Sequence, residues 1–146
     1  MNILFFLTPK AECAYLEEDE SLREAMERME VTGFTALPLL AKDGRYLETL
    51  TEGDLLRAVK TLCVMDLRQA EKHSIMECTH RRETRAVSAN TQIDDLVNVA
   101  IDQNFVPVVD DKNAFIGIVT RKAILQYCLD QYIAAEKAVE QSRREA

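Results

Sequence analysis

The chain contains one pattern twice, and this internal repeat limits its possible folds more than any other feature. Pro38 of TALPLL corresponds to Pro107 of FVPVVD, and Thr51 corresponds to Thr120, each pair 69 positions apart. The apolar positions of SLREAMERM match those of QIDDLVNVA at an offset of 71. A repeat of this length is a supersecondary unit, and two copies bury their apolar faces by packing on each other. We therefore expect two similar units that form one pair.

Each copy predicts the element order β-α-β-β-α. A short strand, at 13–17 or 85–89, precedes a helix whose apolar residues recur at helical spacing and imply one buried face. The expected helix caps are Ser21 or Asp19 in the first copy, and Asn90 or Thr91 in the second.

Two further strands and a second helix complete each copy. The Asp-Gly pair at 43–44 is a strong hairpin signal between the strands of the first copy, and the run 111–114 is a weaker one in the second. The chain then divides into a first repeat, a linker with helical character, a second repeat and a C-terminal helix or tail, at residues 1–62, 63–74, 75–130 and 131–146.

Charge and cysteine usage exclude several classes of protein. The net charge of −7 argues against a protein that coats nucleic acid. No apolar run approaches the roughly 18 residues of a membrane span, and the start lacks the features of a signal peptide. The four cysteines lie far apart without a CxxC pair, as expected of reduced thiols. We expect a cytoplasmic protein that binds neither nucleic acid nor membrane.

Residue patterns for catalysis or metal binding do not occur in the sequence. His73 and His80 lack HExxH spacing, and neither a Walker pattern nor a Gly-rich loop is found. We therefore expect no enzymatic activity, no catalytic residue and no metal site.

The ordered set of first helix, strand with proline, and strand-threonine-helix ending resembles the cystathionine-β-synthase (CBS) domain, once in each copy. The likeness covers most of residues 7–125, although the LTP start and the Thr-x-x-Asp acid occur only in the first copy. It implies an α/β (α+β) fold, in which two βαββα repeats pack sheet to sheet as a pseudo-twofold pair, or Bateman module. It also implies a homodimer of the small stand-alone type, with adenine nucleotides in two clefts and a regulatory role.

The TEGD segment has two compatible interpretations. Thr51 as helix cap with Asp54 three residues on is a form of the capping box. In CBS pairs the matching threonine and acid hold ribose and phosphate, so the resemblance implies a ligand role for both. The helix start would favour the phosphate.

The matching TRKA segment has Ala123 in place of the acid and two cations in the first helical turn. Cations are unfavourable there unless an anion binds. We therefore expect Arg121 to bind phosphate, whereas Lys122 is interpreted as a solvated side chain. The two clefts should be unequal, with ribose held only beside Asp54.

The resemblance also implies the cleft walls, in which the strand starts of one repeat meet the threonine motif of the other. The first predicted site comprises Thr49, Thr51, Asp54, Arg85, Ala86, Phe105, Val106 and Pro107. The second comprises Ala14, Tyr15, Thr35, Ala36, Leu37, Ile118, Thr120 and Arg121. Taken singly, the apolar members are more typical of a core. The basic run HRRETR at 80–85 is either a solvated loop or a phosphate clamp.

Three functions remain open. The first is a regulatory sensor without catalytic activity that binds AMP, ADP or ATP and acts on an unknown partner protein. The second is a cyclic di-AMP receptor, because GFTALPL and VTRK are similar to segments of small CBS proteins that bind that ligand. The third is a ligand-free interaction scaffold. Apolar residues on more than one face of the second helices predict a homodimer.

Overall fold

The first repeat folds in the predicted order. The computed structural model describes residues 2–79 and 84–146. The repeat consists of β2 (Leu16–Glu17), α1 (Leu22–Thr32), β3 (Ala36–Leu40), β4 (Tyr46–Thr51) and α2 (Glu52–Leu62). Its sheet has the order β2-β3-β4, with β2 parallel and β4 antiparallel to β3.

The second repeat has the same order with one added strand. It consists of β5 (Val87–Ser88), α4 (Ile93–Ala100), β6 (Phe105–Val109), β7 (Phe115–Thr120) and α5 (Arg121–Glu145). Its four-stranded sheet has the order β1-β7-β6-β5, in which β1 is Thr8–Pro9 from the start of the chain. The leading strands β2 and β5 are shorter than predicted, at two residues each.

The helix caps agree with the prediction in one repeat and differ in the other. Ser21 caps α1, and its hydroxyl accepts a hydrogen bond from the Glu24 amide. The prediction of Asn90 or Thr91 for α4 is wrong, because the N-cap is Gln92 without a side-chain cap bond. Residues 88–91 instead form a turn, in which the Thr91 amide donates to the Ser88 carbonyl. The helix therefore begins after that turn.

The N-terminal segment packs on the second repeat although it precedes the first. A 3₁₀ turn (Ile3–Phe6) buries Ile3 in the core of the second repeat, and β1 then pairs with β7. Gly117 allows this approach, because a Cβ there would lie 2.2 Å from the Thr8 carbonyl oxygen. A second 3₁₀ turn (Lys10–Glu12) leads back to the first repeat. The segment up to Pro9 therefore adds to the sheet and core of the second repeat.

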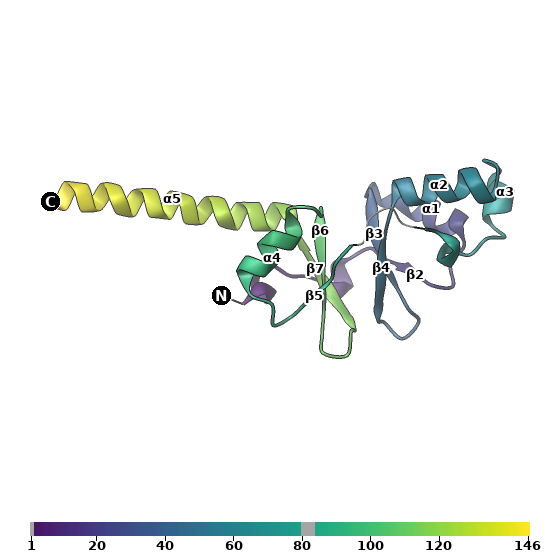
Figure 1. Ribbon diagram of the computed structural model, residues 1–146, viewed down its shortest axis with the longest axis horizontal. Helices are drawn as coiled ribbons and strands as arrows, with labels where there is room; N and C mark the ends of the chain where they lie inside the picture. The colour runs from purple at the N-terminus through teal and green to yellow at the C-terminus, as the bar shows by residue number, and fades with distance from the viewer. Residues whose placement is uncertain (1, 80–83) are drawn as a thin grey trace.

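The two hairpins meet at their turns and join the sheets (Figure 1). Gly44 and Asn113 both have positive φ, at 91° and 63°, as tight turns require. The Tyr46 amide donates to the Asn113 carbonyl at 3.0 Å, and the Phe115 amide donates to the Gly44 carbonyl at 3.0 Å. A shared apolar cluster lies beside this joint, with Leu40, Tyr46 and Phe115 at its centre.

The linker belongs to the core of the first repeat. The linker forms α3 (Leu67–Ala70), which contacts α1 and α2, and a 3₁₀ turn (Ile75–Glu77) follows it; Ala70, Ile75 and Cys78 are buried in the core of the first repeat. The second repeat has a separate core, built on Leu96, Val106, Val108, Val119 and Ile124. Each repeat thus has its own hydrophobic core.

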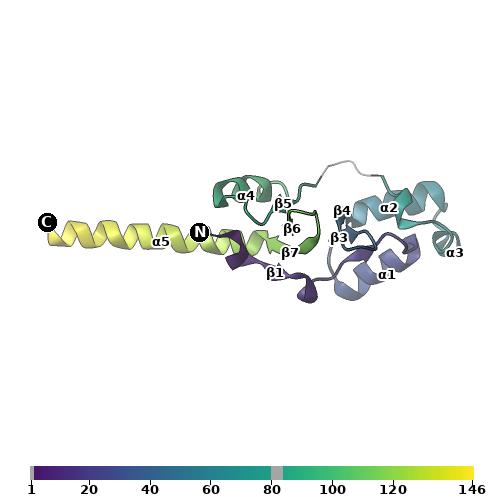
Figure 2. The same ribbon diagram turned by 90° about the horizontal axis from the view of Figure 1, so that it is seen from below.

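The predicted C-terminal helix is continuous with the last helix of the second repeat. Together they form α5, which is 25 residues long and extends away from both sheets in two views (Figures 1 and 2). Every residue from 128 to 146 is exposed. Among the described residues, no helix is both long and apolar enough to cross a membrane.

Candidate functional site

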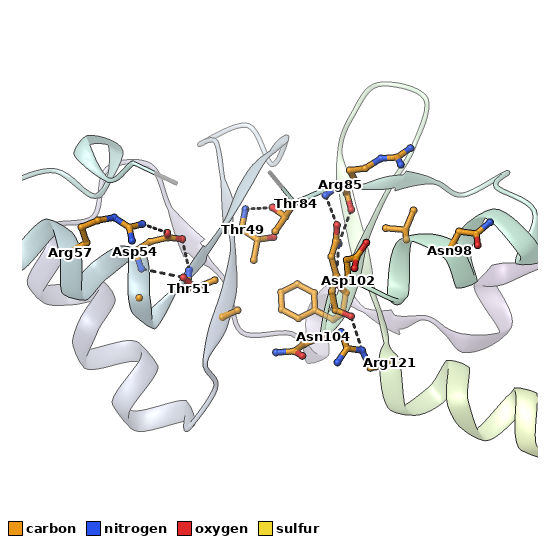
Figure 3. Close-up of a pocket in the computed structure, with 15 residues that line it drawn as sticks. Thr49, Thr51, Asp54, Arg57, Thr84, Arg85, Asn98, Asp102, Asn104 and Arg121 are labelled. Carbon is orange, nitrogen blue, oxygen red and sulfur yellow. Dashed lines mark hydrogen bonds and ion pairs between the residues drawn. The ribbon is translucent and has the colours of Figure 1, made fainter. Parts of the chain in front are cut away.

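A cavity of about 910 Å³ lies between the two repeats (Figure 3). Its wall in the first repeat comes from the start of β3, the end of β4 and the first turns of α2. The opposite wall comes from the end of α4 and the starts of β6 and α5. The lining residues are Ala36, Thr49, Thr51, Gly53, Asp54, Arg57, Thr84, Arg85, Asn98, Val99, Asp102, Gln103, Asn104, Phe105 and Arg121.

Thr51 and Asp54 form the predicted capping box at the start of α2, which is confirmed. The Asp54 amide donates to Thr51 Oγ1 at 3.1 Å, and the Thr51 amide donates to Asp54 Oδ2 at 2.9 Å. The carboxylate is 7% exposed, and its other oxygen accepts from Arg57 at 2.8 Å. The carboxylate is also one of the groups that line the cavity.

Arg57 holds the capping box in place from the next turn of α2. Besides Asp54, its guanidinium reaches the Thr79 carbonyl oxygen at 3.1 Å. This half-buried ion pair fixes the Asp54 carboxylate at the cavity and places a cation next to it. Arg57 was not predicted as a site residue, although a residue three positions after Asp54 is its neighbour on the helix surface.

Three hydroxyl groups connect the repeats at one edge of the cavity. Tyr46 Oη lies 2.8 Å from Thr49 Oγ1 and 3.2 Å from Thr84 Oγ1, and the Thr49 amide donates to Thr84 Oγ1 at 3.2 Å. Burial raises the pKa of Tyr46, so the phenol stays protonated at neutral pH. This network fixes Thr84 against β4 and thereby places the neighbouring Arg85 at the cavity.

Gln103 fixes the other side of the same segment. The Arg85 amide donates to Gln103 Oε1 at 2.7 Å, and Gln103 Nε2 donates to the Arg85 carbonyl at 3.1 Å. The Arg85 guanidinium has no partner among the described residues. It is therefore the cation best able to meet an anionic ligand.

Arg121 has a structural role that the sequence did not reveal. Its Nε donates to the carbonyls of Ala100 and Gln103, each at 3.1 Å, and Nη2 donates to the Ile101 carbonyl at 3.3 Å. These carbonyls lie at the C-terminal end of α4, where a cation is favourable. The cation at the start of α5 is thus stabilised by α4 without any bound phosphate.

The cavity brings together members of both predicted sites. From the first set it includes Thr49, Thr51, Asp54, Arg85 and Phe105, and from the second it includes Ala36 and Arg121. The other predicted residues do not line it: Ala86, Val106, Pro107, Ala14, Tyr15, Thr35, Leu37, Ile118 and Thr120.

Most of these nine residues have other structural roles. Leu37 and Val106 are buried in the two cores. Tyr15, Ala86 and Ile118 pack in the cluster at the hairpin joint. Thr120 caps α5, and the Thr35 carbonyl accepts from the Glu52 amide. In the basic run, residues 80–83 lie outside the described residues, whereas Thr84 and Arg85 line the cavity.

The polar wall from α4 was not predicted. Asn98 belongs to α4, Asp102 follows the end of that helix, and Asn104 precedes β6. Polar residues at the end of a helix are common at any solvated surface, so the sequence carries no signal for them. The cavity is lined by charged side chains of both signs, namely Arg57, Arg85, Arg121, Asp54 and Asp102. Among the described residues, no cluster of side chains could hold a metal ion.

Two βαββα repeats joined at their hairpins, with a cavity between them, define a tandem repeat pair. The family model of the CBS domain matches residues 7–61 and 79–130. The chain therefore belongs to the CBS domain family, and the predicted fold of two CBS repeats forming a pair is confirmed.

Solved structures of CBS proteins are similar over most of the chain. CbpB in complex with c-di-AMP has a TM-score of 0.82 and 19% identity, over 94% of this chain and 91% of CbpB. A CBS domain protein from Streptococcus pneumoniae TIGR4 has a TM-score of 0.77 and 25% identity, over 88% and 86%. CBSX2 in complex with AMP has a TM-score of 0.70 and 20% identity, over 90% and 98%. The comparison with curated proteins gives no match.

Proposed function

We propose that this CBS pair is a non-catalytic regulatory module that binds an adenine nucleotide in the cavity between its repeats. The observation that carries the proposal is one cavity lined by both repeats, to which the first repeat contributes the Thr51–Asp54 helix start and the second contributes the cation of Arg85. Hydroxyl, carboxylate and guanidinium groups are the partners that ribose and phosphate require. The ring of Phe105 and the apolar Ala36 and Val99 offer surfaces for a base.

A cyclic dinucleotide such as cyclic di-AMP is the ligand that we favour. Its two adenosines and two phosphates need more room than a mononucleotide. The volume of about 910 Å³ lies near the upper end of the roughly 300–1,000 Å³ usual for ligand pockets. The similarity to CbpB, solved with c-di-AMP, supports this choice over the first expectation of AMP, ADP or ATP.

A mononucleotide is the second candidate, and a specific feature supports it. Asp54 can accept hydrogen bonds from both hydroxyls of a free ribose, whereas a 3′–5′ cyclic dinucleotide offers one hydroxyl for each ribose. CBSX2, with a similar fold, was solved with AMP. The two candidates differ in stoichiometry and in their requirement for the ribose diol.

Regulation would follow from the position of the cavity. A ligand that contacts both repeats alters the contact between them, and a partner protein that recognises one arrangement would sense occupancy. Linkage then requires the ligand and the partner to change each other's affinity by the same factor.

The test is a thermal-shift and calorimetry series with cyclic di-AMP, AMP, ADP and ATP. At 100 times the dissociation constant, a ligand adds about 2.7 kcal/mol, which corresponds to a rise of about 5–10 °C for a chain of this size. We expect the largest shift with cyclic di-AMP. A larger shift with a mononucleotide would favour the second candidate, and no shift with any of the four would leave a ligand-free scaffold.

Two matched variants locate the site. Arg85→Ala should weaken binding about tenfold or more, because it removes an ionic hydrogen bond to phosphate. Lys122→Ala is the control, since this exposed cation does not line the cavity. Equal affinity of both variants would contradict this site.

A further inference from the structure

The last helix has an apolar stripe that no other part of the described chain covers. Leu125, Leu129, Tyr132 and Val139 are 61%, 50%, 61% and 52% exposed. Together with Glu136, which lies between Tyr132 and Val139, these residues are spaced alternately four and three positions apart. This is the heptad spacing of a helix that pairs with another helix.

The stripe faces away from the rest of the molecule. The helix is held to the second repeat by buried Ile124 and by Tyr127, whose ring lies 5.1 Å from that of Phe6. At about 100° per residue, the stripe lies on the side of α5 opposite these contacts. A second helix can therefore approach it without displacing the second repeat.

The stripe begins in a shallow groove with a basic edge. The groove has a volume of about 420 Å³ and is lined by Arg121, Lys122, Leu125, Gln126 and Leu129. Arg121 is engaged with the α4 carbonyls. Lys122 makes no hydrogen bond or ion pair with any residue in 2–79 or 84–146, so its charge is available to a partner.

The far part of the same face carries the opposite charge. Glu136 and Glu140 follow the groove by about two to three turns and lie on the side of the helix that carries Lys122. Both are exposed. One end of the stripe thus offers apolar side chains with a free lysine, and the other offers apolar side chains with two glutamates.

We propose that α5 pairs with α5 of a second copy in antiparallel orientation. In the register that we infer, Leu129 packs on Tyr132 of the second copy, and Lys122 packs along Val139 with its ammonium group near Glu136 and Glu140. The twofold axis repeats each contact. The overlap of residues 121–140 is about 30 Å long.

Antiparallel pairing follows from the charges. A parallel pair in register would place Glu136 against Glu136 and Lys122 against Lys122, at positions that face the partner helix. Like charges in such positions are unfavourable, because burial removes the water that would screen them. The antiparallel register replaces both repulsions with attractions. The pairing needs no nucleotide and does not depend on the proposed function.

Disulfide trapping tests the orientation in the protein without ligand. In a Cys13→Ser/Cys128→Ser background, Lys122→Cys with Val139→Cys should form a covalent dimer on oxidation, because these positions face each other. Val139→Cys alone should stay monomeric on a denaturing gel. Rapid linkage of Val139→Cys alone indicates a parallel pair, and linkage of neither variant indicates no pair; both results overturn the proposal.

A charge exchange tests the contacts by sedimentation equilibrium. Lys122→Glu should weaken dimerisation about tenfold, because attraction becomes repulsion at two symmetric places. Glu136→Lys with Glu140→Lys should weaken it similarly, and the triple variant should recover affinity within about threefold of the original. Failure of the triple variant to recover affinity overturns the antiparallel register.

A final pair of variants separates pairing from folding. Leu129→Glu, on the stripe, should abolish the α5 contact, whereas Ala134→Glu, on the opposite face, should not. Both positions are exposed, so circular dichroism should show the same helix content for each monomer. Equal dimerisation of these two variants overturns the proposal.

Discussion

The starts of α2 and α5 occupy the same place in the two repeats, yet different side-chain contacts stabilise them. Thr51 and Thr120 each accept a hydrogen bond from the amide three residues on, at 3.1 Å in both cases. In α2 the acid Asp54 completes the box, whereas α5 has Ala123 there and directs Arg121 to the end of α4. In the first repeat the start of the second helix is therefore stabilised by contacts within that helix. In the second repeat it is stabilised by contacts between two helices.

The difference explains why the second repeat does without the acid. Arg121 links α5 to α4 through three carbonyl oxygens, so the start of α5 is already held in place. Asp54 remains in the first repeat, where it faces the cavity. The divergence places Asp54 on one wall of the cavity and Arg121 on the opposite wall.

The largest effect should come from the strand that only the second repeat receives. Gly117→Ala places a methyl group 2.2 Å from the Thr8 carbonyl, so β1 must shift. We expect a loss of about 3 kcal/mol in the free energy of unfolding. Urea denaturation measures it. Gly53→Ala in α2 is the control and should be neutral or stabilising, because a Cβ there meets its nearest atom at 3.7 Å. Equal effects would mean that β1 contributes little.

The two helix starts can be exchanged. Asp54→Ala removes half of the capping box and leaves Arg57 without its carboxylate, so we expect a loss of about 2 kcal/mol in the free energy of unfolding. Ala123→Asp gives α5 the missing acid and should gain about 0.5 kcal/mol. Chemical denaturation of both variants checks the comparison. A neutral Asp54→Ala variant would show that the box is not what stabilises the first repeat.

Neighbouring cations at the start of α5 should behave differently. Arg121→Ala leaves the last carbonyls of α4 without their donor, and we expect a loss of about 1.5 kcal/mol in the free energy of unfolding. Lys122→Ala removes an exposed charge and should change stability by less than about 0.5 kcal/mol. Thermal denaturation of the monomer at low concentration distinguishes them. If the two losses match, Arg121 is as free in solution as its neighbour.

The last comparison concerns a thiol of the first core. Burial, and then the charge of Asp54, raise the pKa of Cys78 to about 12. Because the unfolded thiol loses its proton first, the contribution of Cys78 is fully present below pH 9 and decreases as the pH rises towards 12. The slope is about 1 kcal/mol per pH unit.

Denaturation between pH 8 and pH 10.5 measures this slope. Cys78→Ala should reduce the loss of stability over that interval. Cys128→Ala, at an exposed thiol of the second repeat, should retain it. An unchanged slope in Cys78→Ala would assign the pH dependence to other groups, such as Tyr46, whose pKa burial also raises.

The sequence alone determined the repeat, the order of its elements and the caps of two helices, α1 and α2. These features depend on residues close together in the chain. Helical periodicity brings Leu22, Ala25 and Met29 onto one buried face, and Thr51 meets Asp54 because helix geometry places the third residue beside the cap. The same local rules failed at α4, where a turn at 88–91 competes with the expected cap.

Only the tertiary structure decided which distant residues meet. The N-terminal strand reaches β7, Gln103 binds the backbone of Arg85, and Arg121 binds the end of α4, although nothing in the local patterns distinguishes these residues. The cavity has the same origin, because its walls come from segments that lie up to 85 positions apart, from Ala36 to Arg121. Such contacts depend on how two finished repeats dock, and neither periodicity nor capping chemistry encodes that geometry.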